Sequence, residues 1–151
     1  MRPAPHLFLD ASVWVAAAGS QTGGSALVLA LCRHGKVKCK SSRLVLLEAE
    51  RNIQAKLGQA ALLRFYQELA SLDLDSVATL TDEEIARQTQ FIDPKDAHVL
   101  AAAIKGKVDF LLTLDRKDFM TLRVQEARFP FQIMTPGDFL KHWLKQHNSQ
   151  S

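Results

Sequence analysis

The sequence predicts an α/β fold in which a parallel sheet has helices on both faces, and three observations lead to this prediction. Short apolar runs alternate with longer segments that carry apolar residues at helical spacing. Residues 108–114 form an apolar run that is typical of a strand buried on both faces. Residues 97–104 are apolar almost all round a helix, which indicates a central position. Strands separated by helices favour a parallel sheet.

The first half of the chain supplies expected strands and helices in alternation. The segment HLFL is a short apolar run, KVKC alternates polar and apolar residues, and LDLDSV resembles a third strand. Gly35 ends one expected helix, and a serine cap and Gly58 delimit the next. The expected strands are residues 6–9, 36–39 and 72–77, and the expected helices are residues 12–19, 24–35, 41–58 and 59–72.

The second half continues the alternation. Thr81 and Glu84, three residues apart, predict a capping box at a helix start. Asp93 suits the N-cap of the following helix, Pro94 suits its first position, and Gly106 ends it. The expected helices are residues 81–92, 94–105 and 135–146, and the expected strands are residues 108–114 and 128–134.

The length and composition favour one domain. The chain has 151 residues, and we expect a single domain over 1–151, with a core over about 7–140 and a frayed tail over 147–151. No apolar run approaches the roughly 20 residues that cross a membrane, and the N-terminus does not resemble a secretory signal. We therefore expect a cytoplasmic protein without a membrane partner.

The cysteines and the net charge narrow the classes of site. Cys32 and Cys39 show neither a disulfide framework nor zinc-ligand spacing, so we expect two reduced, buried thiols. The formal charge of +3 and the pI near 9.0 lean mildly toward a polyanionic partner.

Four acids stand where sites form in such a fold. Asp10 directly follows the first expected strand, and Asp115 directly follows the strand 108–114. Sites in open parallel sheets lie beyond the carboxyl ends of the strands, so both carboxylates share one edge if these strands are neighbours. Asp96 lies at a helix start, and Glu48 lies at the margin of the apolar stripe of its helix.

Each acid also has a structural explanation. Asp93 and Asp96 can bond the free amide groups of a helix start. Asp10 and Asp115 can cap the helices that follow them. Glu48 can be an exposed helix acid. These explanations weaken when the acids are taken together, because converging carboxylates repel one another unless a cation neutralises them.

A carboxylate cluster without cysteine or histidine suits Mg²⁺ or Mn²⁺. Such an ion activates water and stabilises charge on a phosphoryl group. A basic surface attracts a polyanion toward the same place. The residues alone therefore support the hypothesis of metal-dependent phosphodiester cleavage.

Four segments together resemble the PIN-domain family. They are FLDASVWVAA, SSRLVLLEAERNI, DPKDAHVLAAAI and FLLTLDRKDF, in this order and spacing. The resemblance runs from residue 7 to about residue 140. The patterns DPxDxxxLAxA and TxDxxDF are most similar to the small stand-alone members of the VapC-like group, which are the toxin components of type II toxin–antitoxin systems.

The resemblance implies a parallel five-stranded sheet between helices and a Mg²⁺- or Mn²⁺-dependent endoribonuclease. It also implies RNA as the substrate, a cognate antitoxin and a homodimer. By match to the motifs, the catalytic acids would be Asp10, Glu48, Asp96 and Asp115, of which Asp10, Asp96 and Asp115 would hold the metal. Supporting residues would be Ser12, Thr113 and Asp118, and Asp93 stands close by in the sequence. Lys95, Arg116 and Lys117 flank the site and are candidate RNA contacts, or else a solvated rim.

Other functions compete with this interpretation. A housekeeping RNA-processing nuclease would share the fold and the acids. A non-catalytic binding module could use the same domain as a scaffold. A phosphotransfer receiver needs an acid pair near the first strand, which the residues before Asp10 do not supply. A haloacid-type phosphatase needs DxD where this chain has DAS.

Overall fold

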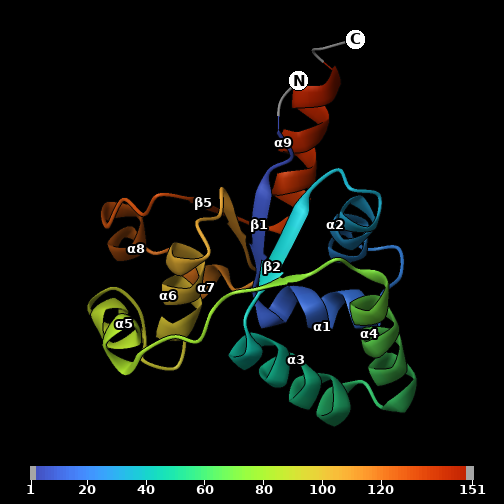
Figure 1. Ribbon diagram of the computed structural model, residues 1–151, viewed down its shortest axis with the longest axis horizontal. Coiled ribbons are helices and arrows are strands. Elements are labelled where there is room, and N and C mark those ends of the chain that lie inside the picture. The colour runs from blue at the N-terminus through green and yellow to red at the C-terminus, as the bar shows by residue number, and fades with distance from the viewer. Residues whose placement is uncertain (1–2, 149–151) are drawn as a thin grey trace.

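The computed structural model describes residues 3–148, in which strands and helices alternate around a central sheet (Figure 1). Within these residues five strands pair in parallel, in the order β3-β2-β1-β4-β5. The strands are β1 (His6–Leu9), β2 (Lys38–Ser41), β3 (Asp75–Ser76), β4 (Phe110–Leu112) and β5 (Gln132–Met134). The predicted five-stranded parallel sheet is confirmed.

Helices cover both sides of the sheet. Figure 1 shows α5, α6 and α8 on one side of the strands and α2 and α4 on the other. The helices are α1 (Ala11–Gly19), α2 (Gly24–Arg33), α3 (Arg43–Lys56), α4 (Gln59–Ser71), α5 (Asp82–Ala86), the 3₁₀ helix η1 (Arg87–Gln90), α6 (Ala97–Lys105), α7 (Arg116–Phe119), α8 (Leu122–Glu126) and α9 (Pro136–Asn148). This arrangement is the predicted three-layer α/β/α fold.

The core lies where the apolar runs predicted it. Leu7, Phe8 and Leu9 of β1 are fully buried, as are Leu111 and Leu112 of β4. Six of the nine residues of α6 are also buried, which explains why this helix is apolar almost all round. Cys32 and Cys39 are buried and unbridged, as expected.

The second strand begins two residues later than predicted. Gly35 has a φ of +72°, and the amide of Lys36 donates to the carbonyl of Leu31 at 2.9 Å. Residues 35 and 36 therefore complete the end of α2 instead of starting β2. A left-handed glycine followed by such a hydrogen bond is a common way to end a helix.

The entry to α6 also differs from the prediction. Asp93 caps a turn and not the helix itself: its Oδ1 accepts from the amide of Lys95 at 2.9 Å, and its carbonyl accepts from the amide of Asp96 at 2.9 Å. The helix begins at Ala97, so Asp96 takes the N-cap position, where its side chain makes no capping hydrogen bond. The carboxylate of Asp96 is thereby left for other contacts.

Two helices end at places other than those expected. The predicted helix 81–92 divides into α5 and the 3₁₀ helix η1, although its capping box of Thr81 and Glu84 is confirmed. The final helix continues through Asn148, so residues 147 and 148 of the expected tail are helical. Residues 149–151 lie outside the described part of the chain.

Within residues 3–148, no single helix is long and apolar enough to span a membrane. The consecutive helices α1 and α2 reach the length and apolar composition of a membrane span only when they are taken together, and the angle between them is 98°.

Candidate functional site

The candidate site lies at the carboxyl ends of β1 and β4. These strands are parallel neighbours, with Leu9 opposite Leu112, and the amide of Asp10 donates to the carbonyl of Leu112 at 3.1 Å. The residues that follow the two strands therefore leave the sheet side by side. Asp10 and Asp115 stand at one edge, at the end of the sheet where α1 begins (Figure 1).

Asp10 is held in a fixed orientation by three donors. The amide of Ala11 donates to its Oδ1 at 2.7 Å, and the hydroxyls of Thr113 and Ser12 donate to its Oδ2 at 2.8 and 3.2 Å. Only 6% of Asp10 is exposed. Burial raises the pKa of this carboxyl, the three hydrogen bonds oppose the increase, and the charge of Asp115 adds to it.

Thr113 connects the two strand-end acids. Its hydroxyl donates to Asp10 and accepts from the amide of Asp115 at 3.1 Å. Asp115 in turn caps α7, because its Oδ1 accepts from the amide of Asp118 at 3.0 Å. The helix cap expected as the structural explanation of Asp115 is therefore present, and it lies at the edge of the site. Capping orients Asp115 and leaves its second oxygen for another partner.

Three acids approach one another closely at this edge. Among the described residues, Asp96, Asp115 and Asp118 each offer a carboxylate oxygen, and these oxygens lie within 4.8 Å of one another. We call this set the three-acid group. Asp96 is the N-cap of α6, Asp115 is the N-cap of α7, and Asp118 lies in the first turn of α7. Asp10 is not part of this group; it lies near enough for its pKa to respond to the charge of Asp115.

Glu48 reaches the same region from α3. Burial raises its pKa, and the negative charges of Asp10 and Asp96 raise it further. Burial also raises the pKa of Asp96, and the charge of Asp118 adds to this effect against the opposing influence of Lys95. Carboxyls that raise one another's pKa values share a site in which full ionisation is unfavourable. The charges of Asp10 and Asp96 therefore act on Glu48, and the charge of Asp115 acts on Asp10, so these four acids lie in one region at the edge of the sheet.

The three predicted cations are placed differently from one another. The Nζ of Lys95 lies 2.5 Å from Asp96 Oδ2 and 2.9 Å from Asp118 Oδ2, and these contacts raise the pKa of Lys95. An Nη atom of Arg116 lies 3.9 Å from a carboxylate oxygen of Asp138. Lys117 is exposed. Lys95 therefore contacts the acids themselves, whereas Arg116 and Lys117 lie at the rim.

The donor set fits a hard divalent cation. Only carboxylate oxygens form the three-acid group, and such oxygens suit Mg²⁺ and Mn²⁺. Because these oxygens lie within 4.8 Å of one another, Asp96, Asp115 and Asp118 are the residues that would hold such an ion. The ammonium of Lys95 already shows that a positive charge is accepted between two of these acids.

Two further residues belong to the description of the site. Asp118, which the motifs gave as a supporting residue and a possible further ligand, is a member of the three-acid group. The spacing of three between Asp115 and Asp118 could have indicated it, because such residues share one face of a helical turn. His98 follows Asp96 by two positions, and its Nδ1 is buried without a hydrogen-bond partner among the described residues. Burial lowers the pKa of His98.

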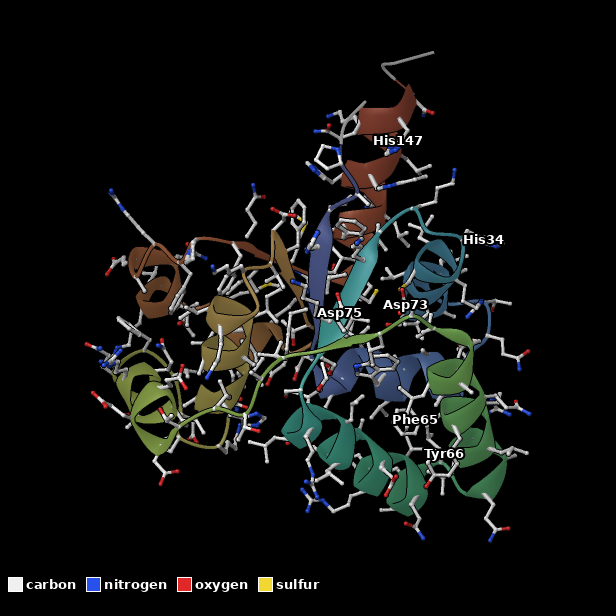
Figure 2. The ribbon with its side chains drawn as sticks, in the orientation of Figure 1. His34, Phe65, Tyr66, Asp73, Asp75 and His147 are labelled. Atoms are coloured by element: carbon white, nitrogen blue, oxygen red, sulfur yellow. The ribbon has the colours of Figure 1, made fainter. Side chains whose placement is uncertain are left out.

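A separate cavity lies at the opposite edge of the sheet. It has a volume of about 880 Å³ and is lined by residues such as Asp109, Phe139 and Trp143. His147, labelled on α9 in Figure 2, also lines it and stacks on Trp143 with ring centroids 3.9 Å apart. None of the predicted site residues borders this cavity, so the acidic edge and the cavity are distinct.

Comparisons with known structures give the same fold. VapBC2 from Rickettsia felis, bound to a DNA fragment from its promoter, matches with a TM-score of 0.61 and 16% identity over 85% of this chain and 96% of that chain. VapC20 from Mycobacterium tuberculosis, described as a toxin that cleaves the sarcin–ricin loop, matches with a TM-score of 0.56 and 15% identity over 82% and 95%. PAE2754 from Pyrobaculum aerophilum matches with a TM-score of 0.56 and 18% identity over 86% and 90%.

The amino-acid sequence matches a family model but no curated protein. The family model described as PIN domain matches residues 6–117, which include all four predicted catalytic acids and most of the sheet. On the strength of this match and of the shared fold, the chain belongs to the PIN-domain family.

Proposed function

We propose that the protein is a metal-dependent endoribonuclease and the toxin component of a toxin–antitoxin pair. The convergence of Asp96, Asp115 and Asp118 at the carboxyl edge of a parallel sheet carries this proposal. Membership of the PIN-domain family and the fold shared with VapC proteins support it.

In this proposal the acids have different roles in holding the metal. Asp96 and Asp115 hold the metal, with Asp10 and Asp118 as the further carboxylates at the same edge. Mg²⁺ or Mn²⁺, when bound, supplies an activated water and neutralises charge on the phosphodiester. Ser12 and Thr113 orient Asp10 through their hydroxyls.

Glu48 has a different role in the proposal. It lies outside the three-acid group, and its pKa is raised by burial and by two neighbouring charges. A carboxyl with a raised pKa can exchange a proton closer to neutral pH than an ordinary glutamate can. We assign Glu48 to holding or moving a proton of the attacking water or of the leaving oxygen.

The substrate proposal rests on charge. The exposed cations Arg116 and Lys117 stand directly after Asp115 in the chain and can hold the phosphates that flank the cleaved bond. The net charge of +3 favours the approach of a polyanion to the protein. These charges suit a polyanion, and membership of the PIN-domain family is the reason that single-stranded RNA is the proposed substrate.

The proposed partners follow from the structural relatives. VapBC2 is a complex that binds DNA from its own promoter. By analogy, we propose a cognate antitoxin that blocks the acidic edge, a homodimer of this chain, and a cytoplasmic location.

Substitution of the metal-holding acids tests the enzymatic part of the proposal. In Asp96→Asn and Asp115→Asn, the rate of cleavage of single-stranded RNA in Mn²⁺ is expected to fall at least about 100-fold. Each substitution removes a negative charge that holds the metal, and the metal stabilises the transition state by several kcal/mol. The matched control is Asp73→Asn, an exposed aspartate of the segment before β3 (Figure 2), which is expected to cleave like the unmodified protein.

Two results would refute the proposal. One is undiminished cleavage by both site variants while they remain folded. The other is cleavage by the unmodified protein that continues unchanged in excess EDTA. Binding of Mn²⁺ without any RNA product would instead favour the non-catalytic binding module.

A further inference from the structure

The lysine between the acids has no role in the proposed reaction. The ammonium of Lys95 contacts Asp96 Oδ2 at 2.5 Å and Asp118 Oδ2 at 2.9 Å. Both aspartates belong to the three-acid group. The ammonium of Lys95 therefore contacts two of the three carboxylates that would hold a metal ion.

The local backbone directs this lysine to its place. Asp93 accepts a hydrogen bond from the amide of Lys95 at 2.9 Å, and its carbonyl accepts from the amide of Asp96 at 2.9 Å. Pro94 restricts the turn between them by its fixed φ. The turn thus sets Lys95 and Asp96 at the entrance of α6, with Lys95 able to reach across to Asp118 on α7.

The exposure of the three side chains favours exchange of the ammonium. The side chain of Lys95 is 63% exposed, whereas the side chains of Asp96 and Asp118 are 15% and 29% exposed. The lysine can therefore leave by rotating into solvent without a change in the backbone. The acids stay where α6 and α7 place them.

Electrostatics then sets up a competition. Without a cation, the acids of the group repel one another, and one ammonium offsets part of that repulsion. A divalent ion carries twice the charge and coordinates the same oxygens directly. The ammonium and the ion cannot both contact Asp96 Oδ2 and Asp118 Oδ2 at close range, because like charges at this distance repel strongly.

We propose that Lys95 is an internal counter-ion that holds Asp96 and Asp118 in the metal-free protein and must be displaced when a divalent cation binds. Lys95 therefore stabilises the metal-free fold and weakens metal affinity by the same free energy. This inference rests on the metal site of the proposed function, and it adds a residue that sets how readily that site fills.

The test is a titration of the full chain, stripped with EDTA, with MnCl₂ in an isothermal calorimeter. Lys95→Met, which keeps most of the side-chain length and removes the charge, is expected to bind Mn²⁺ about threefold to tenfold more tightly, the range that a charge-assisted, partly exposed ion pair spans. The matched control is Lys117→Met, which removes the same charge from the exposed rim and is expected to change the dissociation constant less than about twofold.

A second measurement separates displacement from a general change in charge. In EDTA, Lys95→Met is expected to melt at a lower temperature than the unmodified protein, and this difference is expected to shrink or reverse in saturating Mn²⁺. Lys117→Met is expected to melt alike in both conditions relative to the unmodified protein. Lys95→Gln repeats the comparison with a polar side chain.

The outcomes distinguish this inference from the proposed function. Equal Mn²⁺ affinity in Lys95→Met, Lys95→Gln and the unmodified protein would overturn the counter-ion role and leave the metal site intact. Weaker binding by both Lys95 variants would also overturn it, since the lysine would then assist the metal. Failure of all the proteins to bind Mn²⁺ would overturn the metal site and, with it, the inference.

Discussion

Two regions of this protein pair a carboxylate with a lysine, and the two pairs behave in opposite ways. At the corner of α5 and α6, Glu84 lies 2.9 Å from the Nζ of Lys105, and the pKa of Glu84 falls to about 2. At the sheet edge, Asp96 lies 2.5 Å from the Nζ of Lys95, yet the pKa of Asp96 is raised. A lysine at hydrogen-bonding distance does not by itself decide how a carboxyl titrates.

The surroundings of each pair explain the difference. Glu84 also accepts the amide of Thr81 within the capping box, and this hydrogen bond is the largest influence on its pKa. Asp96 makes no capping hydrogen bond, is partly buried, and faces the charge of Asp118. The surroundings of Glu84 stabilise its ionised form, whereas the surroundings of Asp96 destabilise its ionised form.

This contrast separates a structural acid from a candidate functional acid. A carboxyl whose hydrogen bonds and neighbouring cation favour its charged form contributes to stability. A group of carboxyls that raise one another's pKa values lowers stability and persists where it has a use, such as binding a cation. The contrast leads to four predictions, in order of decreasing effect.

The largest effect is expected from metal at the acidic edge. Mn²⁺ at about 100 times its dissociation constant is expected to stabilise the unmodified protein by about 2.7 kcal/mol, because the ion binds the folded state alone. Urea unfolding with MnCl₂ and with EDTA measures this. Asp96→Asn is expected to lose most of the stabilisation, and Glu84→Gln to keep it. Equal stabilisation of both variants would erase the distinction between the two regions.

The next effect concerns the support of Asp10. Thr113→Val keeps the shape of the side chain but removes the hydroxyl that donates to Asp10 and accepts from Asp115. The free energy of unfolding is expected to fall by about 1–3 kcal/mol, because a buried carboxylate loses a donor. Thr113→Ser keeps the hydroxyl and serves as the control in the same urea titration. A Thr113→Val protein as stable as the control would show that this hydrogen bond is unimportant to the edge.

A smaller effect is expected in the capping box. Thr81→Ala removes the oxygen that accepts from the amide of Glu84 at 3.1 Å. The loss of such a cap is expected to lower the free energy of unfolding by about 1 kcal/mol. Thr81→Ser should restore it in the same measurement. RNA cleavage is expected to be unchanged, and a change in cleavage would link this corner to the site.

The smallest effects are expected on the pH dependence of stability, measured in EDTA, when the charge of Glu84 or of Asp96 is removed. The two substitutions are expected to change stability in opposite directions. The pKa of Glu84 lies below its ordinary value of 4.5, so its stabilisation is present above pH 4.5 and is lost as the pH falls toward 2. Glu84→Gln should therefore be less stable than the unmodified protein above pH 4.5, with the difference shrinking below it.

Removing the charge of Asp96 is expected to change stability in the opposite direction. Its pKa lies above the ordinary value of 3.8, so the unmodified protein loses stability as the pH rises from 3.8 through the raised pKa. Asp96→Asn should gain relative stability over the same window. Thermal melts from pH 3 to pH 7 compare the two variants, with roughly one pH unit between samples. Variants that shift in the same direction would contradict the comparison.

The strands and their direction could be predicted because their signal is local. Apolar runs marked β1 and β4, although β4 takes up only Phe110–Leu112 of the predicted 108–114, and the helical segments between strands favoured parallel connections. The capping box at Thr81 was equally local, since both of its hydrogen bonds join residues three apart. The start of β2 was not predicted, because the end of α2 extends through Gly35 and Lys36 by hydrogen bonds that no periodicity reveals.

The candidate site shows the same division. That acids follow β1 and β4 was visible in the sequence, and the adjacency of these strands brought Asp10 and Asp115 to one edge. The grouping of Asp118 with Asp96, and the reach of Lys95 to both, depends on how α6 and α7 meet. Asp118 lies 22 positions after Asp96 and 23 after Lys95, and packing of distant segments decides such contacts.

The sequence by itself determined the order of strands and helices in the chain, the apolar core and the acids that end two strands, because periodicity and turn chemistry act over a few residues. Only the tertiary structure decided which carboxylates face one another, which lysine lies between them and which acid has a raised pKa. Those properties arise from distances across the sheet edge, where burial and like charge act between segments that the chain alone does not place side by side.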